Sequence, residues 1–283
     1  MPATDANGQP LADRSLSEDL AAMREAAREA GQLALSYQAR GTVEAWEKTP
    51  GHPVTDADLA VNVLLARRLG AARPFYGWLS EETVDDPKNR MSDRVWVVDP
   101  IDGTRAFMAG DPFWCIGLAV VERGRPVASV IYAPVSDELF EARTGGGAYL
   151  NGDPLAVASC GGIDGCRMLA SRQLMDHPSW REPWPAVRLS KPNATLLRLA
   201  LIAAGRYDAA MALWHKSDWD LAAGALILEE AGGRATTHSG NPFRFNREVP
   251  LQQSLVAAGK DLHPLLIERT KLAPVPDPHD AGA

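Results

Sequence analysis

Apolar residues recur at helical spacing near the beginning of the chain. Six of them lie three or four positions apart, which predicts an amphipathic helix: Leu20, Met23, Ala27, Ala30, Ala34 and Tyr37. Ser15 and Glu18 have the spacing of a capping box, so we expect this helix to begin at Ser15 and to end before Gly41. A second helix is expected to begin near Thr55 and to continue through Leu69.

Short apolar runs separated by turns occupy the middle of the chain. The run at 95–98 leads into Asp99 and Pro100, which predicts a buried strand that the proline stops. Later runs are joined by short turns such as 122–125 and Asn151-Gly152, a pattern typical of an antiparallel meander. These runs lie at 116–121, 127–132, 138–142 and 148–150.

Strands and helices alternate in the remaining sequence, which predicts an α/β arrangement. The expected strands lie at 167–170, 209–213 and 255–258, and the expected helices at 195–204, 221–231 and 262–271. The proline-containing stretch 178–192 is expected to be a loop near the join between the halves.

Two packed halves are therefore predicted, with one cleft between them. The N-terminal α+β half spans 15–154 and the C-terminal α/β half spans 155–271. Residues 1–14 and 272–283 are expected to be loose tails.

Composition and charge narrow the class of protein. Hydrophobic residues make up 46% and charged residues 23%, as in ordinary soluble globular proteins. The formal net charge of -7 disfavours nucleic acid as a partner, because phosphate neutralisation needs clustered Lys and Arg. If the substrate carries phosphate, local positive charge must come from metal ions or from a few placed cations.

The expected location is the cytoplasm, without membrane attachment. Cys115, Cys160 and Cys166 form no CxxC pair, which favours reduced thiols. The chain has no run of about 20 apolar residues that could span a bilayer. Its start, 1–14, is polar and has no apolar signal-peptide core.

The most informative segment is Asp99-Pro100-Ile101-Asp102-Gly103-Thr104. Two carboxylates this close repel each other, and a hard divalent cation such as magnesium relieves that repulsion. The free N–H groups at Gly103 and Thr104 could hold phosphate oxygens at a helix start. The alternative interpretation is a turn in which an aspartate acts as a cap.

Other acidic residues are less specific when each is taken alone. Glu81-Glu82 follows a short apolar stretch and would ordinarily be a solvated surface. Asp58 lies three residues after Thr55, which is the spacing of a capping pair. Asp220, beside Trp219, begins an apolar small-residue helix, where a buried carboxylate needs a partner.

Together and in this order, these segments resemble the inositol monophosphatase superfamily of lithium-sensitive, metal-dependent phosphatases. The resemblance covers about 17–267 and includes 53–58, 80–82, 99–104 and 219–224. The glycine-rich segment 145–148 with Asn151-Gly152 is similar to the family's hairpin region. The resemblance implies an α+β fold of layered α-β-α-β-α type with the site between the two halves.

The resemblance also implies the ligands of two magnesium ions. Glu81, Asp99 and the backbone carbonyl of Ile101 would hold the first ion, and Asp99, Asp102 and Asp220 the second. A weaker third ion could use Glu81 through water, with Glu82 nearby.

The attacking water would be oriented by Thr104, helped by Glu81 or Asp58. The substrate phosphate would be bound by Gly103 and Thr104, in a site that also includes Asp102 and Asp220.

The branch of the superfamily depends on the residues after the threonine. Arg105-Ala106-Phe107 stands where inositol monophosphatases usually have Asn-Phe and where CysQ-type bisphosphate nucleotidases usually have a basic residue followed by Glu-Phe. Arg105 therefore favours 3'-phosphoadenosine 5'-phosphate as substrate, with AMP and phosphate as products, although Ala106 departs from that pattern. The alternative is an inositol monophosphatase acting on myo-inositol phosphate.

Lys216 is a second candidate substrate contact. For both Lys216 and Arg105 the alternative is an ordinary solvated side chain. A regulatory member that binds RNA or a transcription complex is a further interpretation, disfavoured by the acidic charge and the intact carboxylate set. The sequence leaves a homodimer open.

Overall fold

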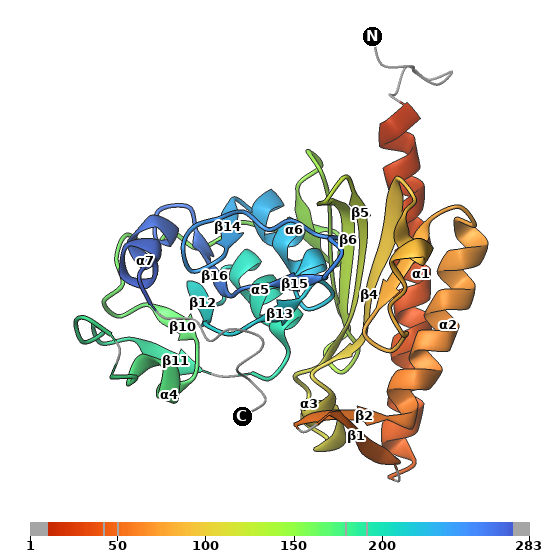
Figure 1. Ribbon diagram of the computed structural model, residues 1–283, viewed down its shortest axis with the longest axis horizontal. Coiled ribbons are helices and arrows are strands. Elements are labelled where there is room, and N and C mark those ends of the chain that lie inside the picture. The colour runs from red at the N-terminus through yellow and green to blue at the C-terminus, as the bar shows by residue number, and fades with distance from the viewer. Residues whose placement is uncertain (1–10, 42, 50, 179, 191, 274–283) are drawn as a thin grey trace.

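The computed structural model describes residues 11–41, 43–49, 51–178, 180–190 and 192–273. Helices and sheets stack in five layers across the molecule (Figure 1). An outer helix pair covers one sheet, a central pair lies between two sheets, and the last helices cover the second sheet. The helices, in this order, are α1 (Leu11–Ala39) and α2 (Asp56–Ala72), α5 (Thr195–Ala203) and α6 (Ala222–Glu230), then α4 (Arg172–Met175) and α7 (His263–Thr270). The predicted α-β-α-β-α fold is confirmed.

The first sheet has seven strands in the order β3-β4-β5-β6-β7-β8-β9. Only β3 and β4 are parallel, and the others form the predicted antiparallel meander. Trp96 and Val98 face α1 and α2, whereas Val95 and Val97 face α5 and α6. Because helices cover both faces, its strands have continuous apolar runs. The strands are β3 (Gly77–Ser80), β4 (Arg94–Asp102), β5 (Cys115–Glu122), β6 (Arg125–Ala133), β7 (Glu138–Arg143), β8 (Ala148–Leu150) and β9 (Asp153–Pro154).

The second sheet is mixed, with the order β11-β10-β12-β16-β14. Its strands are β10 (Arg167–Leu169), β11 (Arg188–Ser190), β12 (Ala209–Ala212), β14 (Gly233–Thr236) and β16 (Leu255–Gly259). Two short ribbons and two short helices complete the description. They are β1 (Ala45–Thr49) with β2 (His52–Thr55), β13 (Lys216–Ser217) with β15 (Leu251–Gln252), η1 (Pro87–Arg90) and α3 (Thr104–Met108).

Three local predictions are wrong. Helix α1 already includes Leu11, and Ser15 does not cap it; its hydroxyl accepts a hydrogen bond from Arg94 at 2.8 Å. Pro100 does not stop β4, because the irregular end of this strand tolerates a residue without an N–H. The stretch 178–192 contains β11, which pairs with the edge of the second sheet.

Other expectations concern the ends and the surroundings of the protein. The predicted tails fall mainly on 1–10 and 274–283, which lie outside the described residues. The three cysteines are free thiols. Among the described helices, none is long and apolar enough to cross a membrane.

Candidate metal centre

Strand β4 carries two of the candidate ligands, Asp99 and Asp102, at its carboxyl end. On a regular strand, residues three apart point to opposite faces. Here Asp99 lies opposite Gly117 and Asp102 opposite Cys115, so β4 contains one extra residue at this point. Such a bulge re-aims the side chains that follow it. It allows both carboxylates to face the same space.

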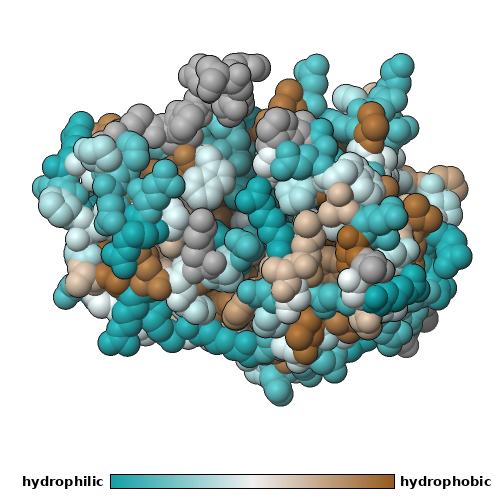
Figure 2. Space-filling model, turned by 90° about the horizontal axis from the view of Figure 1, so that it is seen from below, coloured by the Kyte–Doolittle hydropathy of each residue, from teal (hydrophilic) through white to brown (hydrophobic). Residues whose placement is uncertain are grey.

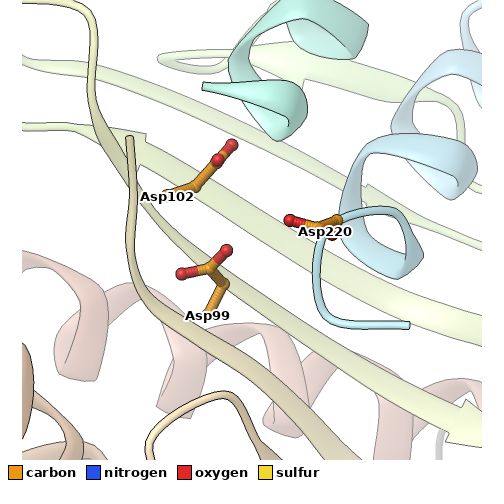
Figure 3. Close-up of side chains that lie close together, drawn as sticks. All are labelled: Asp99, Asp102 and Asp220. Carbon is orange, nitrogen blue, oxygen red and sulfur yellow. The ribbon is translucent and has the colours of Figure 1, made fainter. Parts of the chain in front are cut away.

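Asp220 comes from the other half of the molecule, in the loop between β13 and α6. Its Oδ2 accepts a hydrogen bond from the backbone N–H of Ser217 at 2.9 Å, which fixes the turn. Figure 3 shows Asp220 reaching toward the space between Asp99 and Asp102. Carboxylate oxygens of the three residues lie within 4.8 Å of one another. These three aspartates are called the carboxylate cluster below.

The surroundings of Asp99 show that the carboxylate cluster fits a cation. Asp99 is 1% exposed, and its Oδ1 finds no hydrogen-bond donor among the described residues. Burial raises the pKa of Asp99 well above its usual range, and the charges of Glu81, Asp102 and Asp220 act in the same direction. A buried acceptor without a donor is unfavourable. An all-oxygen set of this kind suits a hard divalent cation such as magnesium.

Asp102 is held by the start of helix α5. Its two carboxylate oxygens accept hydrogen bonds from the backbone N–H groups of Thr195, at 3.0 Å, and Leu196, at 2.5 Å. Burial raises the pKa of Asp102 to about 6 and Asp220 acts in the same direction, whereas Lys216 and these N–H groups lower it. The first N–H groups of a helix have no partner within the helix and favour negative charge. The helix start predicted at Thr195 was the signal that could have revealed this contact.

Glu81 follows β3 and lies beside the carboxylate cluster. Strand β3 runs parallel to β4, and the backbone N–H of Glu81 donates to the carbonyl of Val98 at 3.2 Å. Lys48 on β1 contacts Glu81 at 3.3 Å and Glu82 at 2.5 Å. Burial raises the pKa of Glu81 to about 8, although Lys48 lowers it. No role is predicted for Lys48, because nothing in the local sequence shows that a separate hairpin reaches these acids.

Thr104 and Asp58 form a polar pair behind the cluster. The Thr104 hydroxyl lies 3.2 Å from Asp58 Oδ1 and 3.3 Å from the carbonyl of Ile101. Asp58 also accepts hydrogen bonds from the N–H and hydroxyl of Thr55, so the expected capping pair is present. Burial raises the pKa of Asp58 to about 6, and these hydrogen bonds oppose the shift. Asp58 can therefore cap α2 and orient Thr104 at once.

Gly103 fixes the beginning of α3 beside the cluster. Its φ is +98°, a conformation that L side chains rarely adopt. A Cβ at this position would also lie 2.9 Å from the carbonyl oxygen of Phe113. The backbone at this cavity-lining position therefore favours glycine over any other residue.

A cavity of about 320 Å³ opens beside the carboxylate cluster. Figure 2 shows the face on which α3 and the β1–β2 hairpin lie, where hydrophilic residues predominate and apolar ones are scattered. The predicted site residues that line the cavity are Glu81, Asp99, Ile101, Asp102, Gly103, Thr104, Arg105, Lys216 and Asp220. Asp58 is the predicted residue that does not line it. The structure adds His52, Asn193, Thr195 and Trp214, which no sequence motif indicated.

The two candidate substrate contacts already have partners within the protein. Arg105 donates from Nη2 to the carbonyl of Gly51 at 2.6 Å. Lys216 donates to the hydroxyl of Thr195 at 2.8 Å and lies 3.9 Å from Asp220. Both side chains line the cavity, so each could also contact a ligand there.

A layered α+β fold with candidate oxygen ligands from both halves at one cavity is the arrangement expected of a metal-dependent phosphomonoesterase. The model of the inositol monophosphatase family matches residues 15–273, and the chain belongs to this family.

Three relatives and one solved structure illustrate the similarity. An inositol-1-monophosphatase from Caulobacter vibrioides is 31% identical, over 89% of this chain and 100% of the relative. A histidinol-phosphatase from Chlorobaculum parvum is 33% identical, over 77% of this chain and 85% of the relative. A Nus factor SuhB from Xylella fastidiosa is 33% identical, over 83% of this chain and 88% of the relative. The crystal structure of extragenic suppressor protein suhB from Bartonella henselae superposes with a TM-score of 0.76 at 28% identity, over 89% of this chain and 97% of that protein.

Proposed function

We propose that this protein hydrolyses a small phosphate monoester with magnesium ions held at the carboxylate cluster. The single observation that carries the proposal is the carboxylate cluster itself: oxygens of its three members lie within 4.8 Å of one another, and the buried Oδ1 of Asp99 finds no donor among the described residues. Asp99 would hold both of two ions, with Glu81 and the Ile101 carbonyl on one side and Asp102 and Asp220 on the other. A weaker third ion would use Glu81 through water, with Glu82 nearby.

Bound magnesium would supply a water of lowered pKa and would neutralise charge on the leaving oxygen. The residues of the chain orient the reactants. Thr104 is placed to accept a hydrogen bond from the attacking water, because its own proton can be given to Asp58 Oδ1, 3.2 Å away. The N–H groups of Gly103 and Thr104, two residues that line the cavity, would hold phosphate oxygens.

Inositol monophosphate is the first candidate substrate. The family match and the inositol-1-monophosphatase from Caulobacter vibrioides support it. The cavity of about 320 Å³ is at the small end of ligand sites, which favours a single ring bearing one phosphate.

A bisphosphate nucleotide such as 3'-phosphoadenosine 5'-phosphate is the second candidate. The observation in its favour is that Arg105 and Lys216 line the same cavity, since a second phosphate needs cations that the metal ions do not supply. Arg105 would have to exchange its bond to the Gly51 carbonyl for one to that phosphate.

A regulatory role in a transcription complex is the alternative outside catalysis. The name of the Xylella fastidiosa relative is consistent with it. The net charge of -7 disfavours a basic face for RNA, and the complete set of candidate ligands favours catalysis.

A phosphatase screen with magnesium tests these proposals. The substrates are inositol 1-phosphate, 3'-phosphoadenosine 5'-phosphate, fructose 1,6-bisphosphate and histidinol phosphate. Turnover of inositol 1-phosphate with the highest kcat/KM supports the first candidate. The absence of turnover on all four substrates, together with salt-sensitive RNA binding, would instead support the regulatory role.

A further inference from the structure

Asp220 is the one candidate ligand that the C-terminal half contributes, so its position depends on how the halves meet. Glu81, Asp99 and Asp102 all lie on or beside strands of the seven-stranded sheet. Asp220 follows the short strand β13, which pairs with β15. A metal site tolerates errors of only about 0.5 Å in its ligands. Some contact across the boundary between the two halves, called the seam below, must therefore fix the Asp220 loop.

Arg90, at the end of η1, makes such a contact. It is 4% exposed and does not line the cavity. Its Nε and Nη2 donate to the two oxygens of Asp85 at 2.7 and 2.8 Å. Its remaining N–H groups cross the seam to Asn246 Oδ1 at 3.1 Å and to the carbonyls of Arg247 at 2.7 Å and Glu248 at 2.8 Å. All five donors of the guanidinium are thus used.

The loop held by Arg90 is connected directly to the Asp220 turn. The backbone N–H of Asn246 donates to Asp218 Oδ2 at 2.6 Å, and Gln252 donates to Asp218 Oδ1 at 2.7 Å. Asp218 is 0% exposed, and its carbonyl accepts the N–H groups of Leu221 and Ala222, which begin α6. Asp218 therefore connects Asn246 and Gln252 to the start of α6, and the Asp220 turn lies between Asp218 and that helix.

We infer that Arg90 is a positioning residue that sets Asp220 against Asp99 and Asp102. The chain of contacts is Arg90 to the 246–248 loop, then Asn246 to Asp218, then Asp218 to the Asp220 turn. Lysine cannot replace this residue, because an ammonium has three donors and no planar fork. Arg90 contacts neither metal nor substrate, so its effect is on metal affinity through geometry. This inference rests on the proposed metal site.

The test measures manganese binding by electron paramagnetic resonance, in parallel with phosphatase activity and thermal melting. Removing groups that orient metal ligands typically weakens affinity about 10-fold or more. Arg90→Lys should therefore weaken manganese binding about tenfold. A matched control is Glu230→Ala, which removes another contact across the seam: Glu230 on α6 accepts the N–H groups of Gly145 and Gly147 at 2.8 Å each. Glu230→Ala should leave manganese affinity within about twofold of wild type, since its contact is remote from Asp220.

A second variant keeps the test decisive if Arg90→Lys does not fold. Asn246 has a φ of +56°, which glycine adopts without strain. Asn246→Gly retains the N–H that donates to Asp218 but loses the side-chain contacts to Arg90, so a smaller loss of about threefold is expected. Unchanged manganese affinity in the folded Arg90 or Asn246 variants, with lowered melting temperatures alone, would show that the contact is merely structural. Wild-type protein that binds no manganese would instead overturn the proposed metal site itself.

Discussion

Replacing Asp99 with asparagine should stabilise the metal-free protein while abolishing activity. Asp99 is buried, one of its oxygens has no hydrogen-bond partner within the described part of the chain, and its carboxylate lies within 4.8 Å of those of Asp102 and Asp220. Two ionised carboxylates at that distance repel by about 3.5 kcal/mol at an effective dielectric constant of about 20. Protonation relieves part of this repulsion. We therefore expect a net gain of about 1–3 kcal/mol in the free energy of unfolding of the metal-free variant.

Thermal melting in chelator and in saturating magnesium measures the effect. A gain of 1–3 kcal/mol corresponds to a rise of about 2–6 °C at about 2 °C per kcal/mol for a chain of this size. Magnesium at about 100 times its dissociation constant should stabilise wild type by about 2.7 kcal/mol. Asp99→Asn should gain far less, because the proposed bridging ligand is lost. The lead of Asp99→Asn over wild type in melting temperature should therefore shrink by up to about 5 °C when magnesium is added, and it should reverse wherever the metal-free gain is below about 2.7 kcal/mol.

Asp153→Asn is the matched control, because it makes the same chemical change at an exposed carboxylate on β9. It should leave both melting temperatures and the activity close to those of wild type. A metal-free Asp99→Asn variant that melts below wild type would refute the repulsion argument. Substantial turnover by this variant would refute its assignment as a metal ligand.

Three further predictions test the site and the fold. Activity should require magnesium and be inhibited by lithium, as the family resemblance implies, and by calcium, whose coordination is longer and looser; full activity in excess chelator would contradict this. Arg105→Ala should lower kcat/KM for 3'-phosphoadenosine 5'-phosphate by roughly ten- to a hundredfold, corresponding to about 1.5–3 kcal/mol, and should barely change the hydrolysis of inositol 1-phosphate. Equal effects on the two substrates would show that Arg105 does not contact the second phosphate. Burial, with the charge of Arg234, lowers the pKa of His263 to about 4, so the free energy of unfolding should decline by up to roughly 3 kcal/mol as pH falls from 6.5 through 4. In urea unfolding at several pH values His263→Gln should flatten this decline, and an unchanged dependence of the free energy on pH would exclude His263 as its source.

The pattern of the sequence was sufficient for most elements and for the pair Asp99 and Asp102, whereas the other candidate acids came from the resemblance to the family. Strands covered on both faces have continuous apolar runs, so β4, β5 and β6 could be recognised from local sequence. Prediction failed where a contact with a distant segment outweighed the local signal. The capping-box spacing at Ser15 indicated a helix start, yet the Ser15 hydroxyl contacts Arg94 on a distant strand. Prolines at 183 and 185 suggested a loop, but β11 follows them on the sheet edge.

The sequence by itself determined that Asp99 and Asp102 form a candidate cation site, because two carboxylates followed by glycine and threonine are a local pattern. The resemblance to the family was needed to add Glu81 and Asp220. Only the tertiary structure decided that Asp99 and Asp102 share one face, since this depends on a bulge in the pairing of β4 with β5. It also decided that Lys48 reaches Glu81 and that the start of α5 holds Asp102. These contacts join separate segments of chain, and the packing of the layers brings them together. A local pattern carries no record of that packing.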